Sequence, residues 1–418
     1  MRPTVLVTGA TGFIGRRLCA RLGHDHQVLA LVRSREGQSA HERARALDPS
    51  LVAIEGDLDT LDPADLARQV RSALDALGAT RLHGVVSCAA RIRMDHAGQT
   101  AERRRQVADR NHQTNVEGLR RLAEAFEILG PPPSVRIARP SIVAGVGSKD
   151  AYMAFLAYLN GRAAGVRLAT FARLAMQPLP RHVCVPLPGN PQALLDIVDC
   201  DDVVEALTNF LAHDLALQKG GPGVGAWLHV STAYVHGRST GLLKETGVPP
   251  SVQTINSYEA SKGEGERLLA AWVEGRAPLA FNHLTNPSAP TVQQVVQLTL
   301  RASGWSEHNA QRLRFFPQGA PFQAAMADFR RQNRVTHRVA RGLWDRVPML
   351  VDYLDRPEGV RFCTDQTQAV LARQHQTYAP RAFDEAYVRE LVAAFARSEP
   401  RWRPGLRFRR TSTTTGRR

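Results

Sequence analysis

Short apolar runs alternate with segments of helical periodicity in the first third of the chain. These runs are nearly continuous in hydrophobic residues, which is typical of parallel strands that are buried on both faces. They lie at residues 4–8, 27–32, 52–56 and 82–90. A helical pattern follows the first run, and another, LRRLAEAF, continues after Asn115 and Gly118. Strands that alternate with helices predict an α/β fold with a parallel sheet.

Helical periodicity dominates the chain beyond about residue 275, where we expect a smaller, mainly helical substrate domain. The predicted helices lie at residues 291–302, 307–314, 321–331 and 383–397. The aromatic and aliphatic residues of 344–353 are explained by ordinary core packing or by the lining of an acyl pocket. Residues 151–174 are fairly apolar, but arginines and an asparagine interrupt them. They indicate a helix near a substrate pocket or in the core, and no run is long enough to span a bilayer.

A glycine-rich turn follows the first predicted strand. The strand TVLVT is followed by Gly9-Ala-Thr-Gly12-Phe-Ile-Gly15 and then by the helical pattern RRLCARL. Glycines let the backbone approach a pyrophosphate closely, and the helix N-terminus directs its free N–H groups at the phosphates. Strand, glycine turn and helix in this order predict a dinucleotide site in a Rossmann-type, doubly wound sheet.

The type of dinucleotide is indicated at the end of the second predicted strand, 27–32, where Arg33 follows. NAD enzymes usually place an acidic residue here to bond the ribose 2′-hydroxyl, whereas an arginine suits a 2′-phosphate. The sequence therefore favours NADP(H) over NAD(H). The alternative is a solvated arginine at a strand end.

Several motifs together resemble the extended short-chain dehydrogenase/reductase superfamily, from the N-terminus to about residue 290. They are TGATGFIG at 8–15, Gly56-Asp57-Leu58, SCAA at 87–90, Asn115 with Gly118, ARPSIV at 138–143, STAY at 231–234 and Tyr258-x-x-x-Lys262. A narrower resemblance is to the acyl-thioester and fatty-acyl-CoA reductase branch. It rests on LVRS at 31–34, HVSTAYVHG at 229–237, SYEASKGEGERLL at 257–269, RPSIVAG at 139–145 and FNHLTNPSAPTV at 281–292. Sugar-nucleotide epimerases and hydroxysteroid dehydrogenases share most of these motifs.

The resemblance implies roles for the catalytic residues. Tyr258 donates a proton to the carbonyl oxygen, and Thr232, with Ser231 as the alternative, orients that oxygen. Lys262 lies one helical turn from Tyr258, so both side chains share a face. A free phenol has a pKa near ~10, and we expect the Lys262 ammonium to lower it. Asn115 supports the active-site helix and a water path.

The resemblance also implies which residues contact the cofactor. They are Gly9, Thr11, Gly12, Phe13, Ile14, Gly15, Arg33, Asp57, Leu58, Ala89, Ala90, Pro140, Ser141, Ile142 and Lys262. No metal is expected, because Asp199, Asp201 and Asp202 fit a turn and helix cap. Packing or loop roles explain His83, His229 and His236 better than metal ligation.

The order of the motifs departs from the family. There, the STAY strand and the Tyr-x-x-x-Lys helix precede the RPSIV strand and the DIVDCDDVVEAL segment, whereas here they follow them. Blocks 127–219 and 220–274 look exchanged, and the junctions EILGPPPS, LQKGGPGVGA and VEGRAPLA are loop-like. Each helix of a parallel sheet returns the chain to the base, so all three junctions should lie there. We expect every strand to keep its family position, although one crossover must then skip a position.

These patterns divide the chain into three parts. Residues 1–274 form an NADP-binding domain, with part of 150–215 contributing to the substrate side. Residues 275–400 form the substrate-binding region, and 401–418 form a basic, disordered tail.

Composition indicates which partners and which cellular location to expect. The formal net charge is +15, which suits a polyphosphate cofactor, and no nucleic-acid motif is present. Five cysteines (Cys19, Cys88, Cys184, Cys200, Cys363) without C-x-x-C spacing argue against disulfides and structural zinc. The chain begins directly with a strand, so no secretory signal is expected. We expect a cytoplasmic protein without a nucleic-acid partner or transmembrane segment, and we consider a homodimer as its assembly.

Three functions follow as hypotheses. The first is an NADPH-dependent reductase of a carbonyl or thioester in a small-molecule or carrier-linked acyl substrate. The second is a sugar-nucleotide or sterol-type dehydrogenase/epimerase. The third is a non-catalytic NADP-binding protein, against which the combination of Thr232, Tyr258 and Lys262 argues.

Overall fold

The computed structural model describes residues 2–93, 95, 99–145, 184–218, 223–304, 306–332 and 353–398. The segments 151–174 and 344–352 and the tail 401–418, for which the sequence makes predictions, lie outside the described residues. The chain divides into two compact units. The first comprises Met1–Asp150, Gln192–Pro290 and Arg356–Ala382, and the second Ala151–Pro191, Thr291–Asp355 and Phe383–Arg418.

The first unit contains a parallel sheet of seven described strands in the order β11-β5-β9-β4-β1-β2-β3. Its strands are β1 (Thr4–Thr8), β2 (Gln27–Val32), β3 (Val52–Glu55), β4 (Leu82–Ser87), β5 (Val135–Pro140), β9 (Val224–Val230) and β11 (Leu279–Leu284). Two short parallel pairs accompany it: β6 (Ile142–Ala144) with β8 (Ile197–Asp199), and β10 (Leu242–Leu243) with β13 (Arg361–Phe362). The predicted doubly wound α/β fold is confirmed.

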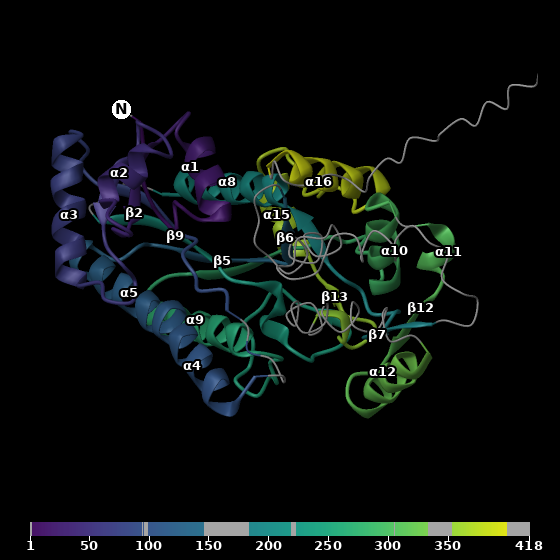
Figure 1. The fold of residues 1–418 in the computed structure, drawn as a ribbon. Helices are drawn as coiled ribbons and strands as arrows, with labels where there is room; N and C mark the ends of the chain where they lie inside the picture. The colour runs from purple at the N-terminus through teal and green to yellow at the C-terminus, as the bar shows by residue number, and fades with distance from the viewer. Residues whose placement is uncertain are drawn as a thin grey trace, which may run out of the picture. The chain divides into compact units, whose positions relative to one another are not determined.

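Helices cover both faces of this sheet (Figure 1). The helical segments are α1 (Phe13–Leu22), α2 (Ala40–Arg45), α3 (Pro63–Ala76), α4 (Ala101–His112), η1 (Gln113–Glu117), α5 (Gly118–Leu129), α8 (Cys200–Ala216), η2 (Ala233–His236), α9 (Ser257–Val273) and α15 (Asp365–Ala372). Two hydrophobic clusters result, one with α1, α8 and α15 and the other with α3, α5 and α9. Val5 and Val7 join the first cluster and Leu6 the second, because successive strand residues point to opposite faces. The continuous apolar runs of the sequence therefore reflect burial on both faces.

The sheet keeps the strand positions expected from the family despite the changed chain order. Strand β9 lies between β4 and β5, so the connection from β4 to β5 skips one position and the chain fills it later. At the base of the sheet, the N–H of Val224 donates to the carbonyl of Gly130 (2.8 Å), and that of Val135 donates to Pro278 (3.1 Å). The three junctions thus meet there, and this prediction is confirmed.

The described part of the second unit is mainly helical. It contains α10 (Val292–Ala302), α11 (Glu307–Ala310), α12 (Ala320–Gln332) and α16 (Glu385–Ser398), with β7 (Val185–Pro188) parallel to β12 (Leu313–Phe316). The predicted helices at 291–302, 321–331 and 383–397 are confirmed. The predicted helix 307–314 is wrong beyond residue 310, because LRFF at 313–316 pairs with β7 as a strand, which suits its aromatic residues.

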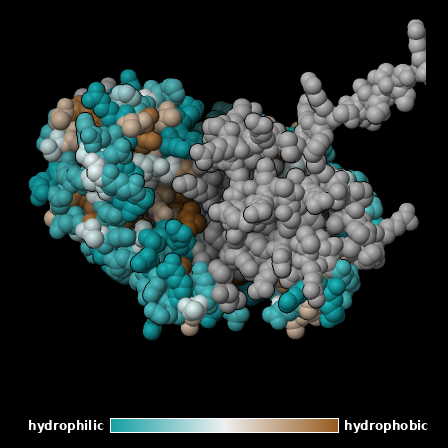
Figure 2. All heavy atoms as spheres, in the orientation of Figure 1, coloured by the Kyte–Doolittle hydropathy of each residue, from teal (hydrophilic) through white to brown (hydrophobic). Residues whose placement is uncertain are grey.

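Among the described residues, no helix is long and apolar enough to cross a bilayer. Hydrophilic side chains predominate among the described residues on the face in view (Figure 2).

Candidate active site

The glycine turn between β1 and α1 leaves a stretch of bare backbone. Gly9 has a positive φ of 71°, and a Cβ there would lie 2.7 Å from the Ala89 nitrogen. A Cβ on Gly15 would lie 2.1 Å from the Gly9 carbonyl oxygen. Gly12 begins α1 without a side-chain cap. Close backbone approach at an uncapped helix N-terminus fits a dinucleotide diphosphate, because the free N–H groups can bind it. Thr11, Phe13 and Ile14 complete this turn.

The residues predicted for the adenosine end lie at the carboxyl ends of β2 and β3. The Arg33 Nη1 lies 3.0 Å from the Asp57 Oδ2, and both side chains are partly exposed. Leu58 is buried, and a Cβ on Gly118 would lie 2.8 Å from its Cβ. The Arg33 guanidinium is therefore at the sheet edge where a ribose 2′-substituent would be read, with Asp57 as its present partner.

Lys262 brings the Tyr-x-x-x-Lys helix to the same edge of the sheet. Its Nζ donates to the Val230 carbonyl, the last residue of β9, at 2.7 Å. Burial lowers its pKa to about 8, while the Glu266 carboxylate and the nearby Cys88 side chain act in the opposite direction. Cys88 directly precedes Ala89, which contacts the glycine turn. Helix α9 therefore lies at the carboxyl edge of the sheet, where the segment that contacts the glycine turn also lies.

Tyr258 is buried near the start of α9. Burial raises the pKa of its phenol above the usual value, and the neighbouring Glu259 carboxylate raises it further. The expectation that Lys262 lowers this pKa is wrong for the protein without its cofactor, because the ammonium is directed to the Val230 carbonyl. Tyr258 is therefore held in the neutral form, which is the form that donates a proton.

Thr232 and Ser231 follow β9 at the same edge. The Thr232 hydroxyl caps η2, because it accepts from the Tyr234 N–H at 3.3 Å. The same hydroxyl donates to the Pro140 carbonyl at 3.4 Å. The Ser231 N–H donates to the Ala138 carbonyl (2.7 Å). Its buried hydroxyl has no hydrogen-bond partner within the described part of the chain. Either hydroxyl could meet a substrate oxygen, so both remain candidates.

Asn115 ties α9 to the segment after β4. It lies in η1, the π-helical turn between α4 and α5, a form often found at functional sites. Its Nδ2 donates to the Arg91 carbonyl (3.1 Å) and to the Ser261 hydroxyl (2.9 Å), and its Oδ1 accepts from the Arg91 N–H. Ser261 stands between Tyr258 and Lys262 on α9. Asn115 thus links their helix to the strand-end segment that follows Ala90.

The end of β5 completes this edge. Pro140 is its last residue, and the Ser141 N–H donates to the Leu284 carbonyl of β11 at 3.1 Å. Ile142 opens β6 and donates to the Asp196 carbonyl at 3.3 Å. The structure therefore places the segment Pro140–Ile142 at the carboxyl ends of neighbouring strands, next to Thr232.

A buried charge network behind the site was not identified from the sequence. Arg139, with no exposed side-chain surface, makes two hydrogen bonds of 2.9 and 2.6 Å to Glu266 and one of 2.8 Å to the Thr246 carbonyl. The imidazoles of His236 and His283 lie 3.3 Å apart beside it. Burial, with Arg139 nearby, lowers the pKa of each imidazole to about 3. Glu266 lies one helical turn after Lys262 in the sequence, and this spacing was the signal that could have identified it as part of the network.

The other polar residues singled out in the sequence have structural contacts. Asp199 caps α8, since its Oδ1 accepts from the Asp201 N–H at 2.7 Å. The His83 Nδ1 accepts from the Thr4 N–H at 3.0 Å, and the His229 Nδ1 lies 2.8 Å from the Ser87 hydroxyl. No group of three or more His, Cys, Asp or Glu residues suited to a metal ion occurs among the residues that the structure describes.

Parts of the sequence and the fold are similar to those of known proteins. Residues 5–138 match the model of the NAD dependent epimerase/dehydratase family. Among solved structures, the terminal R domain from the myxalamid PKS-NRPS biosynthetic pathway is 14% identical, with a TM-score of 0.51, over 95% of this chain and 91% of that chain. The dTDP-glucose 4,6-dehydratase of Bacillus anthracis str. Ames is 11% identical, with a TM-score of 0.42, over 96% and 99%. None of the curated proteins matches the sequence.

The fold and the family match define an enzyme class: an NAD(P)-dependent enzyme of the oxidoreductase type, built on a Rossmann sheet. Residues 5–138 are the part of the chain that the family model covers, and over 95% of its length the chain resembles the R domain in fold.

Proposed function

We propose that the protein uses NADPH to reduce a carbonyl or thioester of an acyl substrate. The observation that carries this proposal is the contact between the Lys262 Nζ and the Val230 carbonyl at the end of β9. With this contact, the Tyr-x-x-x-Lys helix lies at the sheet edge where the glycine turn also lies, although the chain reaches that edge in a changed order. The proposed proton donor and the proposed nucleotide loop therefore share one edge of the sheet.

The residues divide the chemistry among them. The dinucleotide supplies the hydride when it is bound. Tyr258, kept neutral by burial, donates its phenolic proton to the substrate oxygen that gains negative charge. The hydroxyl of Thr232, with Ser231 as the alternative, donates a hydrogen bond to the same oxygen. The Lys262 ammonium would hold the nicotinamide ribose of the bound dinucleotide, and in that complex its positive charge would favour the phenolate that Tyr258 leaves behind.

The acyl substrate class is supported by the motifs of the fatty-acyl-CoA reductase branch. They extend from LVRS at 31–34 to FNHLTNPSAPTV at 281–292. The fold likeness to an R domain of a PKS-NRPS pathway, over 95% of the chain, is compatible with a carrier-linked acyl group. A sugar-nucleotide or sterol-type dehydrogenase/epimerase is the second candidate, because residues 5–138 match the epimerase/dehydratase family model.

A substrate comparison tests the proposal. The purified protein is incubated with NADPH and either long-chain acyl-CoA, a long-chain aldehyde or a panel of nucleotide sugars, and NADPH oxidation is followed by absorbance. The assays are run below pH 8, where Lys262 keeps its proton. We expect oxidation with the acyl-CoA or the aldehyde. Turnover of nucleotide sugars alone would reject the acyl assignment and support the second candidate.

Arg33 is expected to determine the preference for NADPH. Replacing Arg33 with alanine should lower kcat/KM for NADPH about 10- to 100-fold, because hydrogen bonds to a charged group contribute about 1.5–3 kcal/mol. The value for NADH should change little, since NADH has no 2′-phosphate. Steady-state kinetics with both dinucleotides measures the ratio. Arg68→Ala, at another exposed ion pair, is the matched control. An equal loss with both dinucleotides would contradict recognition of the phosphate.

A further inference from the structure

We propose that Arg356 is a positioning residue that holds the Tyr258 turn of α9 against the Thr232 turn after β9. The proposal rests on the function proposed above, because it assigns Tyr258 and Thr232 to the same substrate oxygen. Arg356 stands 97 residues after Glu259 in the sequence, at the start of the third stretch of the first unit, Arg356–Ala382.

The first contact of Arg356 is with α9. Its Nη2 donates to a carboxylate oxygen of Glu259, the residue that follows Tyr258. Both side chains are almost completely buried, with exposures of 4% for Arg356 and 0% for Glu259. Such a pair keeps its geometry, because separating the two charges would leave each one buried and unpaired. The position of the first turn of α9 therefore depends on Arg356.

The second set of contacts is with η2. The Arg356 Nη1 donates to the Gly237 carbonyl at 3.3 Å, and its guanidinium carbon lies 4.0 Å from the centre of the Tyr234 ring. Tyr234 lies within η2, which Thr232 caps and Gly237 ends. Gly237 has a φ of 55°, and a Cβ there would lie 2.1 Å from the Gln253 carbonyl oxygen. One guanidinium thus contacts both turns that carry the proposed donors.

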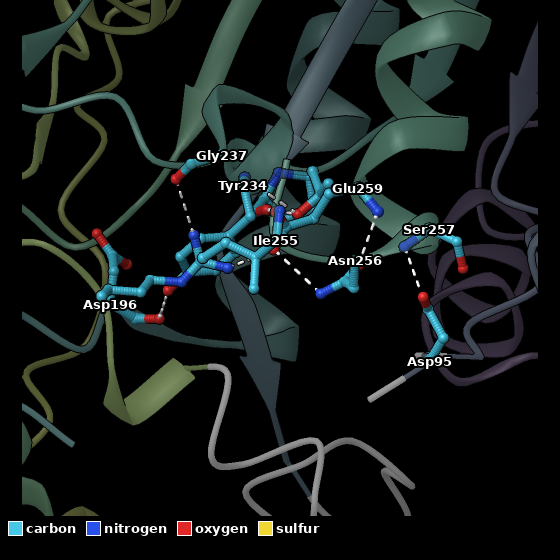
Figure 3. Close-up of polar contacts among 11 residues, drawn as sticks. Asp95, Asp196, Tyr234, Gly237, Ile255, Asn256, Ser257 and Glu259 are labelled. Atoms are coloured by element: carbon cyan, nitrogen blue, oxygen red, sulfur yellow. Dashed lines mark hydrogen bonds and ion pairs between the residues drawn. The ribbon is translucent and has the colours of Figure 1, made fainter. Parts of the chain in front are cut away.

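The surrounding hydrogen bonds fix the first turn of α9 and the turn η2 in their positions (Figure 3). The Glu259 carboxylate also accepts from the Ile255 N–H at 3.0 Å, and the Tyr234 hydroxyl donates to the Asp196 carbonyl at 3.1 Å. On the far side of the helix start, the Ser257 N–H donates to Asp95 at 2.7 Å. The carboxylates of Glu259 and Asp95 are thereby fixed to backbone N–H groups on either side of Tyr258 in the sequence. The positive charge of Arg356 offsets the negative charge of Glu259.

A matched control is present in the same unit. Arg136 and Asp214 form a buried ion pair with two hydrogen bonds, of 2.8 and 2.6 Å, and side-chain exposures of 6% each. Arg136 is the second residue of β5, toward the base of the sheet, whereas the proposed donors lie at the opposite edge. Loss of this pair should destabilise the fold without changing the site.

The test compares Arg356→Met with Arg136→Met in the full-length protein. Arg356→Met should lower kcat for NADPH-dependent reduction of the active acyl probe by about 10- to 100-fold, because small misplacements of reacting groups are costly. The dissociation constant for NADPH, measured by fluorescence titration, should stay within about twofold of wild type, since Arg356 is not near the glycine turn in these contacts. Arg136→Met should retain the wild-type kcat per folded molecule.

Three further measurements make the outcome decisive. Arg356→Lys should recover part of the lost kcat, and it replaces Arg356→Met if that variant does not fold. Adding Glu259→Gln to Arg356→Met should cause little additional loss, because the two residues act as a pair. Backbone hydrogen exchange, which needs no substrate, should increase at 233–237 and 257–260 in Arg356→Met and not in Arg136→Met.

Failure of this inference is distinguishable from failure of the proposed function. If Arg356→Met matches Arg136→Met in kcat and in hydrogen exchange at both turns, Arg356 has only a stabilising role and the inference is wrong. If Tyr258→Phe keeps wild-type activity, the proposed function is wrong whatever Arg356 does. Increased exchange with unchanged kcat would also overturn the positioning role.

Discussion

Tyr258→Phe is expected to lower kcat/KM for NADPH-dependent reduction by about 10²- to 10⁴-fold, the usual contribution of a general acid. Phenylalanine keeps the ring and removes the proton that the substrate oxygen requires. Burial and Glu259 keep that proton on the phenol in the wild-type protein. Affinity for NADPH should be almost unchanged, because the hydroxyl is not part of the glycine turn. Steady-state rates and fluorescence titration separate the two effects.

A buried tyrosine outside the proposed site provides the control for this variant. Tyr378 lies in the first unit, packs in the hydrophobic cluster of α1, α8 and α15, and is 5% exposed. Its hydroxyl has no hydrogen-bond partner among the described residues, so Tyr378→Phe should keep kcat within about twofold of wild type. Undiminished activity of Tyr258→Phe would contradict the assignment of the proton donor. If neither wild type nor variant turns over any probe while both bind NADPH, the non-catalytic hypothesis would gain support.

The sequence was sufficient to predict the sheet because its strands carry their own signals. The predicted runs at 4–8, 27–32 and 82–90 contain β1, β2 and β4, and their hydrophobic residues enter two clusters. The edge of the sheet that carries the candidate site could also be predicted despite the changed order. Such a site forms at the carboxyl ends of the parallel strands. These ends lie at one edge of the sheet, whatever the order in which the chain forms the strands. The changed order lengthens the connections between neighbouring strands. This raises the contact order, but the contacts between the strands are kept.

The chemistry of individual groups could not be predicted in the same way. The raised pKa of Tyr258 depends on its burial, and burial results from how α9 packs after folding. The Lys262 ammonium was expected to act on the Tyr258 phenol, and the sequence did not show that it donates to the Val230 carbonyl instead. Similarly, Arg356 reaches Glu259 from a distant part of the chain with no motif to mark it. Long-range contacts of this kind become visible only in three dimensions.

The boundary of the strand LRFF at 313–316 shows a related limit. Its residues follow a short helix, Glu307–Ala310, and a continuous helical pattern through 314 was a reasonable interpretation. Pairing with β7 determines the outcome, because the backbone groups along the facing edges of the two short strands then bond to each other. Local periodicity cannot report a partner that lies more than a hundred residues earlier.

Arg139→Met is expected to lower the free energy of unfolding by about 3–5 kcal/mol, the usual cost of breaking a buried ion pair by removing one partner. The Glu266 carboxylate, whose side chain is 3% exposed in the wild-type protein, would lose its two hydrogen bonds in the variant. It would also remove the donor to the Thr246 carbonyl. Urea unfolding followed by circular dichroism measures the change. Arg68→Met, at an ion pair whose arginine side chain is 76% exposed, should change stability by only about 0–1 kcal/mol.

The same pair allows a test of why Arg139→Met destabilises. If the cost comes from the unpaired Glu266 charge, adding Glu266→Leu should recover much of the lost free energy, because a well-packed apolar pair can replace a buried ion pair. A double variant as unstable as the sum of both single variants would instead indicate that packing around Arg139 dominates, including its approach to within 4.5 Å of the Phe281 ring centre. A loss below about 1 kcal/mol for Arg139→Met alone would contradict both explanations, since exposed pairs already contribute that much.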